Sequence, residues 1–111
     1  MGLLLENKVA LITGSSAGIG AGIAAVMARE GADIVVNYRT NAEGAEATAQ
    51  KVRSEGRRAE IVQADVGAGA DVETLIDTAA DRFGRIDILV NNAGITTRMT
   101  FLESDESFFD K

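Results

Sequence analysis

Four short apolar runs alternate along the chain with longer stretches in which apolar residues recur every three or four positions. Unbroken runs are typical of strands buried on both faces of a parallel sheet, and the longer spacing is typical of helices that bury one face. We therefore predict strands at Val9–Thr13, Ile34–Val36, Ala59–Gln63 and Ile88–Val90, separated by helices that stop at Gly31, Gly56 and Gly84. This alternation predicts an α/β fold with a doubly wound parallel sheet and right-handed crossovers.

Several details of the pattern carry expectations about packing. Gly22 lies inside the first helix, where glycine costs about 1 kcal/mol relative to alanine, so we expect it to allow close packing of that helix on the first strand. Asp71 is the expected N-cap of the third helix. After the fourth strand we expect a loop over 95–102, a helix that begins near Ser104, and an apolar sheet edge at Ile88–Val90.

Length, charge and composition narrow the function classes. The 111 residues suffice for one domain, 1–111, and the net charge of −6 argues against general binding of nucleic acid or of an anionic membrane. The chain has no Cys and no His, which removes disulfides, thiolate or imidazole metal sites and the usual general base. No apolar run approaches the roughly 20 residues of a membrane span, and we expect a cytoplasmic protein without a metal.

The junction between the first strand and the first helix holds three glycines and two serines in seven residues, Gly14–Gly20. Such a loop offers backbone N–H groups and a helix N-terminus to a phosphate. A plain glycine-rich turn is the simpler alternative. The same residues, from Gly14 to Gly18, also fit the G-x-S-x-G elbow of serine hydrolases, but that reading lacks the histidine that would activate Ser16.

Three motifs in this order resemble the short-chain dehydrogenase/reductases, which are Rossmann-fold oxidoreductases that use NAD(P). They are the glycine loop, Asp65-Val66 after the third strand, and Asn91–Gly94 after the fourth. The chain is especially similar to the same segment of bacterial glucose dehydrogenases and of oxoacyl- and acetoacetyl-thioester reductases.

The resemblance implies a role for each matching residue. The pyrophosphate and the adenosine ribose would lie along the glycine loop, the adenine against the segment after the third strand, and the central part of the cofactor against the motif after the fourth. Thr13 and Asn91 would tie the first strand to the fourth. The implied cofactor-binding residues are Gly14, Ser15, Ser16, Gly18, Ile19, Gly20, Asp65, Val66, Asn92, Ala93 and Gly94.

The end of the second strand decides which nicotinamide cofactor is preferred. An acid there would bond the ribose 2′-OH of NAD, but the residues present are Asn37, Tyr38 and Arg39, and Tyr38 stands where the resemblance places that acid. We count Asn37 and Arg39 among the cofactor-binding residues. Arg39 could pair with a 2′-phosphate, so we expect NADP(H) to be favoured. Ala17 stands where many NADP-binding relatives carry a basic residue, and use of NAD(H) therefore stays open.

Family chemistry moves a hydride between nicotinamide and a carbonyl or alcohol carbon, with a Tyr and a Lys four residues later at its centre. The single Tyr38 is followed four residues later by Ala42, so no catalytic residue carries over. We expect the cofactor-binding half of an oxidoreductase, inactive as given, whose full-length form acts on a small carbonyl or alcohol substrate and is a homo-oligomer. A non-catalytic nucleotide-binding or interaction module is the alternative.

Overall fold

The computed structural model describes residues 3–67, 69–92 and 98–101 of the chain. Strands and helices alternate up to the fourth strand, and a fifth strand follows. The order is β1 (Val9–Ile12), α1 (Gly18–Arg29), β2 (Asp33–Tyr38), α2 (Ala42–Ser54), β3 (Ala59–Gln63), α3 (Gly69–Phe83), β4 (Ile88–Asn91) and β5 (Arg98–Phe101). The first seven elements confirm the predicted alternation.

The five strands form one sheet in the order β3-β2-β1-β4-β5. β1 lies between β2 and β4 and runs parallel to both, so that Ile12 is level with Val36 on one side and with Val90 on the other. The strand order reverses between β1 and β4, and in open α/β sheets ligands bind outside the carboxyl ends of the strands at such a switch point. The fold therefore directs attention to the loops that follow β1 and β4.

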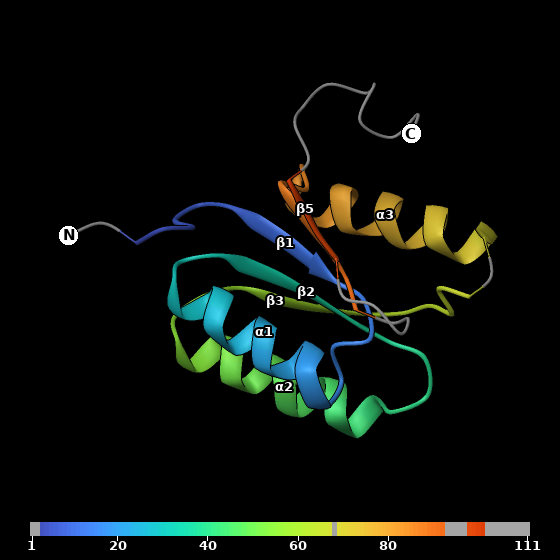
Figure 1. Ribbon diagram of the computed structural model, residues 1–111, viewed down its shortest axis with the longest axis horizontal. Coiled ribbons are helices and arrows are strands. Elements are labelled where there is room, and N and C mark those ends of the chain that lie inside the picture. The colour runs from blue at the N-terminus through green and yellow to red at the C-terminus, as the bar shows by residue number, and fades with distance from the viewer. Residues whose placement is uncertain (1–2, 68, 93–97, 102–111) are drawn as a thin grey trace.

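Helices cover both faces of the sheet, as Figure 1 shows, with α1 and α2 on one side and α3 on the other. Alternate residues of β1 point to opposite faces. Ala10 and Ile12 join a buried cluster with α1 and α2, whereas Val9 and Leu11 join a second cluster with Leu75 of α3. All four β1 residues are buried, which explains why the run is apolar throughout instead of alternating. The doubly wound fold is thus confirmed.

The helices end where the sequence pattern predicted, but the prediction for one glycine inside a helix fails. The three predicted stops, Gly31, Gly56 and Gly84, all have positive φ directly after a helix. The expectation that Gly22 packs closely on β1 is wrong. Gly22 is exposed, and a Cβ added there would meet no atom within 4 Å. The glycine that makes the close approach is Gly20, which lies two residues earlier in the same helix.

Two other expectations are corrected. The segment 98–101 is not loop but β5, which pairs antiparallel with β4, so Ile88–Val90 is not a sheet edge. Its sequence, Arg-Met-Thr-Phe, alternates polar and apolar residues, and pairing satisfies the backbone groups of β4. Asp71 is not the N-cap of α3 but lies in its first turn. The helix expected near Ser104 lies outside the described residues.

Candidate functional site

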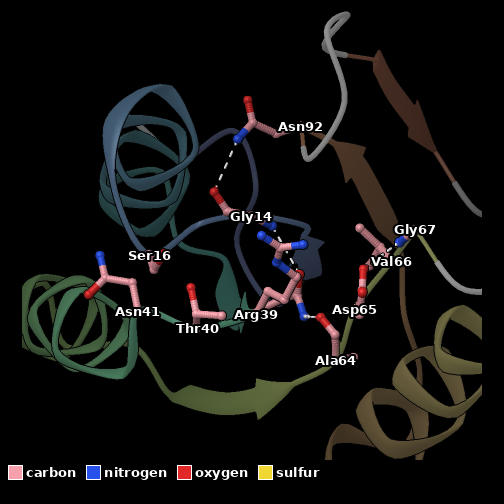
Figure 2. Close-up of a pocket in the computed structure, with 11 residues that line it drawn as sticks. Gly14, Ser16, Arg39, Thr40, Asn41, Ala64, Asp65, Val66, Gly67 and Asn92 are labelled. Carbon is pink, nitrogen blue, oxygen red and sulfur yellow. Dashed lines mark hydrogen bonds between the residues drawn. The ribbon is translucent and has the colours of Figure 1, made fainter.

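A cavity of about 530 Å³ opens at the carboxyl ends of β1, β2, β3 and β4, beside the switch point of the sheet. Its wall comes from the glycine loop, the segment after β2, the segment after β3 and the residue that follows β4. Figure 2 shows residues of these segments around one common space, whereas the Asn41 amide points away from it toward α2. The lining residues are Gly14, Ser16, Asn37, Arg39, Thr40, Asn41, Ala64, Asp65, Val66, Gly67 and Asn92.

The glycine loop presents the N-terminus of α1 without a cap. The N-cap residue Ala17 makes no side-chain hydrogen bond to the helix, and the first turn contains no acid. The first N–H groups of a helix have no partner inside it and carry a partial positive charge. Gly18 has φ of 60°, and a Cβ there would meet open space. This end of α1 therefore suits an anion.

Gly20 allows α1 to lie directly against the loop and the start of the Asn92 segment. A Cβ added to Gly20 would stand 2.5 Å from the Asn92 Nδ2 atom, 2.5 Å from the Gly14 carbonyl oxygen and 2.9 Å from the Ser15 Cα atom. The Asn92 side chain donates to the Gly14 carbonyl, with 3.2 Å between Nδ2 and the oxygen (Figure 2). The close approach thus links the loops after β1 and β4.

Thr13 joins the same two loops from the sheet side. Its N–H donates to the Val90 carbonyl at 3.0 Å, and its hydroxyl oxygen accepts from the Asn92 N–H at 2.8 Å. The hydroxyl also lies 3.4 Å from the Asn91 Oδ1 atom, to which it donates. The predicted structural tie between the first strand and the fourth is confirmed.

Ser15 belongs to the interior and not to the cavity wall. Its side chain is fully buried, and its hydroxyl donates to the Ile12 carbonyl at 2.8 Å while accepting from the Asn37 N–H at 3.0 Å. The Thr48 hydroxyl of α2 donates to the Ser15 carbonyl at 2.8 Å. These bonds anchor the loop to β2 and to α2, so the side chain of Ser15 is turned away from a ligand.

The segment after β2 brings a cation and two polar residues to the rim. Arg39, Thr40 and Asn41 are exposed there, and no ion pair joins Arg39 to a carboxylate within the part of the chain that the structure describes. The Gln63 side chain donates to the Arg39 carbonyl at 3.0 Å, which holds the backbone of the segment. The Asn41 Oδ1 atom accepts from the Gly44 N–H and caps α2. The guanidinium group is thereby left facing the cavity (Figure 2).

The segment after β3 is held by two carboxylates. The Asp65 Oδ1 atom accepts from the Gly67 N–H at 2.9 Å and closes a tight turn. The Asp65 N–H donates to the Asp71 Oδ2 atom at 3.0 Å, so the acid expected to cap α3 instead fixes this segment. Asp65 is exposed at the cavity, and Val66 beside it is half-buried.

The cavity gathers most, but not all, of the predicted site residues. Those that line it are Gly14, Ser16, Asn37, Arg39, Asp65, Val66 and Asn92. Ile19 does not, because its side chain is 71% exposed on the outer surface of α1. Ser15, Gly18 and Gly20 also do not line it, and Ala93 and Gly94 lie outside the described residues.

Sequence reasoning missed Thr40, Asn41, Ala64 and Gly67. Each lies within two positions of a predicted site residue. Asn41 also precedes the apolar pattern of the second helix, and Asn is a favoured N-cap. Treating each site as a segment rather than as single residues would have included all four.

Among residues 3–67, 69–92 and 98–101, no group of three or more His, Cys, Asp or Glu side chains could hold a metal ion. Over the same residues, none of the helices combines the length and the apolar character that crossing a bilayer requires.

Comparisons with known proteins agree with this geometry. A family model for short chain dehydrogenases matches residues 8–111. An uncharacterised oxidoreductase of Methylorubrum extorquens is 46% identical over 91 residues, which are 82% of this chain and 37% of the relative. A 3-oxoacyl-[acyl-carrier-protein] reductase of Staphylococcus epidermidis is 39% identical over 104 residues, which are 94% of this chain and 43% of the relative.

A solved structure of a short chain dehydrogenase of Burkholderia cenocepacia, in complex with NADP, superposes with a TM-score of 0.79 at 47% identity. The alignment covers 82% of this chain and 37% of that one. Against all three of these relatives the chain spans between 37% and 43% of their length. The match over residues 8–111 and the shared fold show that the chain belongs to the short-chain dehydrogenase family.

Proposed function

We propose that the cavity binds a nicotinamide dinucleotide, with NADP(H) favoured over NAD(H). The observation that carries the preference is Arg39, an exposed cation at the cavity rim that no described carboxylate neutralises. A 2′-phosphate would supply the missing negative charge through charge-assisted hydrogen bonds. The Burkholderia cenocepacia relative in complex with NADP supports the same choice.

The residues present fit the parts of such a cofactor. The uncapped N-terminus of α1 suits the pyrophosphate, because unpaired N–H groups and the helix dipole both favour an anion. Arg39 and Thr40 after β2, with the Ser16 hydroxyl of the glycine loop lining the same cavity, suit the 2′-phosphate. The exposed Asp65 carboxylate suits the amino group of the adenine, and Asn92 lies toward the central part of the cofactor.

The reaction proposed for the whole protein is hydride transfer between the nicotinamide and a small carbonyl or alcohol substrate. The cofactor supplies the hydride chemistry, and the residues described here bind and orient it. None of the described residues that line the cavity is a Tyr or a Lys, and Tyr38 packs instead against the buried cluster beneath α1 and α2. We therefore propose that this chain alone binds cofactor without turnover. The cytoplasmic location and the homo-oligomer stay predictions.

The test compares the dissociation constants of NADP⁺ and NAD⁺ for the wild-type chain and for Arg39→Asp. We expect the preference for NADP⁺ to fall by about 10- to 100-fold, because hydrogen bonds to charged groups contribute about 1.5–3 kcal/mol. Arg29→Asp is the matched control. It makes the same change of charge in the last turn of α1, at the end remote from the cavity, and should leave the preference unchanged.

Three results would contradict parts of this proposal. An unchanged preference in Arg39→Asp would remove the assignment of the 2′-phosphate to Arg39. If the wild-type chain bound neither dinucleotide, the cavity would not be a cofactor site. Oxidation of NADPH by the wild-type chain in the presence of a panel of carbonyl compounds would show that it is active alone. Cofactor binding without turnover by the whole protein would favour the non-catalytic module.

A further inference from the structure

The Asn37 side chain lines the cavity and is hydrogen-bonded to two of its walls. We propose that Asn37 is a positioning residue that sets the separation between the glycine loop and the segment 64–67. This inference rests on the proposed dinucleotide function, since the two walls are those that would hold the pyrophosphate and the adenine. Asn37 acts through its neighbours, because its own polar atoms are all engaged within the protein.

The amide group of Asn37 makes three hydrogen bonds to residues that are distant in the sequence. Its Oδ1 atom accepts from the Gly14 N–H at 3.0 Å. Its Nδ2 atom donates to the carbonyl oxygens of Val62 and Ala64, both at 3.2 Å. The residue is only 1% exposed, and a buried polar group held on every side is costly to leave unpaired. The glycine loop and the carboxyl end of β3 are therefore both held in place relative to β2.

The backbone of Asn37 holds the loop a second time. Its N–H donates to the Ser15 hydroxyl at 3.0 Å, and its carbonyl accepts from the Ser15 N–H at 2.9 Å. The N–H groups of both Gly14 and Ser15 are thus occupied by Asn37. An anion at the loop is then left with the N–H groups that follow Ser15, up to the first turn of α1, whose N–H groups have no helical partner. Asn37 thereby selects which amides face the ligand.

This arrangement predicts that a change at Asn37 lowers the affinity for a long ligand more than the affinity for a short one. A dinucleotide that touches both walls benefits from their fixed separation, because binding at one wall brings its other end to the second. Adenine and inorganic pyrophosphate each reach one wall only. A change at Asn37 should therefore weaken the binding of NADP⁺ much more than the binding of either fragment. A variant that only unfolds part of the population would weaken all three equally.

Asn37→Asp is the sharpest test, because it keeps the shape and the acceptor for the Gly14 N–H. It replaces the donor to Val62 and Ala64 by an oxygen that faces two carbonyl oxygens. We expect the affinity for NADP⁺ to fall about tenfold, which corresponds to about 1.4 kcal/mol. The affinities for the two fragments, measured by NMR titration of the full 111-residue chain, should change less than about threefold.

The pH profile of the same variant gives a second signature. Burial beside two carbonyl oxygens should raise the pKa of the introduced carboxyl group, because the charged form is disfavoured there. The protonated carboxyl can donate to one of those carbonyls, so the affinity for NADP⁺, relative to wild type at each pH, should recover as the pH falls from about 8 to about 5.5. A weakening that does not depend on the protonation of this carboxyl group would not recover.

Val35→Ala is the control for lost stability. Val35 lies on the same strand and is fully buried in the cluster under α3, away from the cavity. Truncating its side chain should lower stability but leave all three affinities unchanged at a temperature where the chain stays folded. If Asn37→Asp does not fold, Asn37→Ser carries the test, with a smaller but equally selective loss for NADP⁺.

The outcomes separate the two proposals. Selective loss of NADP⁺ binding with recovery at low pH supports the positioning role. If wild type binds NADP⁺ and the Asn37 variants bind it equally well, or lose the fragments to the same degree, the positioning role is overturned while the cofactor site stands. If wild type binds none of the three ligands, both proposals are overturned.

Discussion

Gly20→Ala tests whether the close approach of α1 to the loops after β1 and β4 requires a residue without a side chain. The added methyl group would stand 2.5 Å from two atoms, the Asn92 Nδ2 and the Gly14 carbonyl oxygen, and 2.9 Å from the Ser15 Cα. Two of these three atoms belong to the backbone and cannot turn aside. The helix must therefore move outward, or the hydrogen bond from Asn92 to the Gly14 carbonyl must break.

The expected cost follows from three terms. Forcing a methyl group into a filled space costs about 1–3 kcal/mol, and a lost hydrogen bond costs about 0.5–1.5 kcal/mol. The better helix propensity of alanine returns about 1 kcal/mol. We expect a net loss of about 0.5–3.5 kcal/mol in the free energy of unfolding. For a chain of this size each 1 kcal/mol corresponds to a fall in Tm of about 4 °C.

The assay is urea unfolding followed by far-UV circular dichroism, with Gly22→Ala as the matched control in the same helix. A Cβ at Gly22 meets no atom within 4 Å, so alanine there should stabilise the chain by about 0.5–1 kcal/mol. The two variants should therefore shift the urea midpoint in opposite directions. A Gly20→Ala variant as stable as wild type, or two shifts of the same sign, would refute the reasoning.

Two other contacts of the site can be tested in the same way. Thr48→Val removes the hydroxyl that donates to the buried Ser15 carbonyl, and we expect the free energy of unfolding in urea to fall by about 1–3 kcal/mol. Thr48→Ser keeps the hydroxyl and should restore most of this loss. An equal loss in both variants would argue against the hydrogen bond. Asn41→Ala removes the cap of α2 and should cost about 1 kcal/mol in the same assay, whereas Asn41→Asp keeps the acceptor for the Gly44 N–H and should cost less.

Local patterns along the sequence predicted most of the fold. The strand at Ala59–Gln63 was placed to the residue, and the helix stops at Gly31, Gly56 and Gly84 were found because a glycine that follows a helical pattern signals its end. β5 was missed, since four residues carry too little pattern to separate a strand from a loop without its pairing partner.

The site was harder to predict, because its contacts join residues far apart in the sequence. The pattern could not show that Gly22 is exposed, because only the tertiary structure shows that a Cβ there would meet no other atom. Ser15 lies inside the glycine loop like Ser16, yet the hydrogen bonds with Ile12 and Asn37 bury it. These distinctions depend on tertiary contacts that no local pattern contains.

Two residues at the end of β2 differ in how much the fold depends on them. Asn37 is buried and holds two walls of the cavity, whereas Arg39 is exposed two positions later and makes no ion pair within the described residues. Surface substitutions away from packed features usually change stability by less than about 0.5 kcal/mol. Selection, natural or in the laboratory, can therefore exchange the residue at position 39 in a single step and keep the scaffold intact. On the proposed role of Arg39, cofactor preference could then evolve without a compensating mutation.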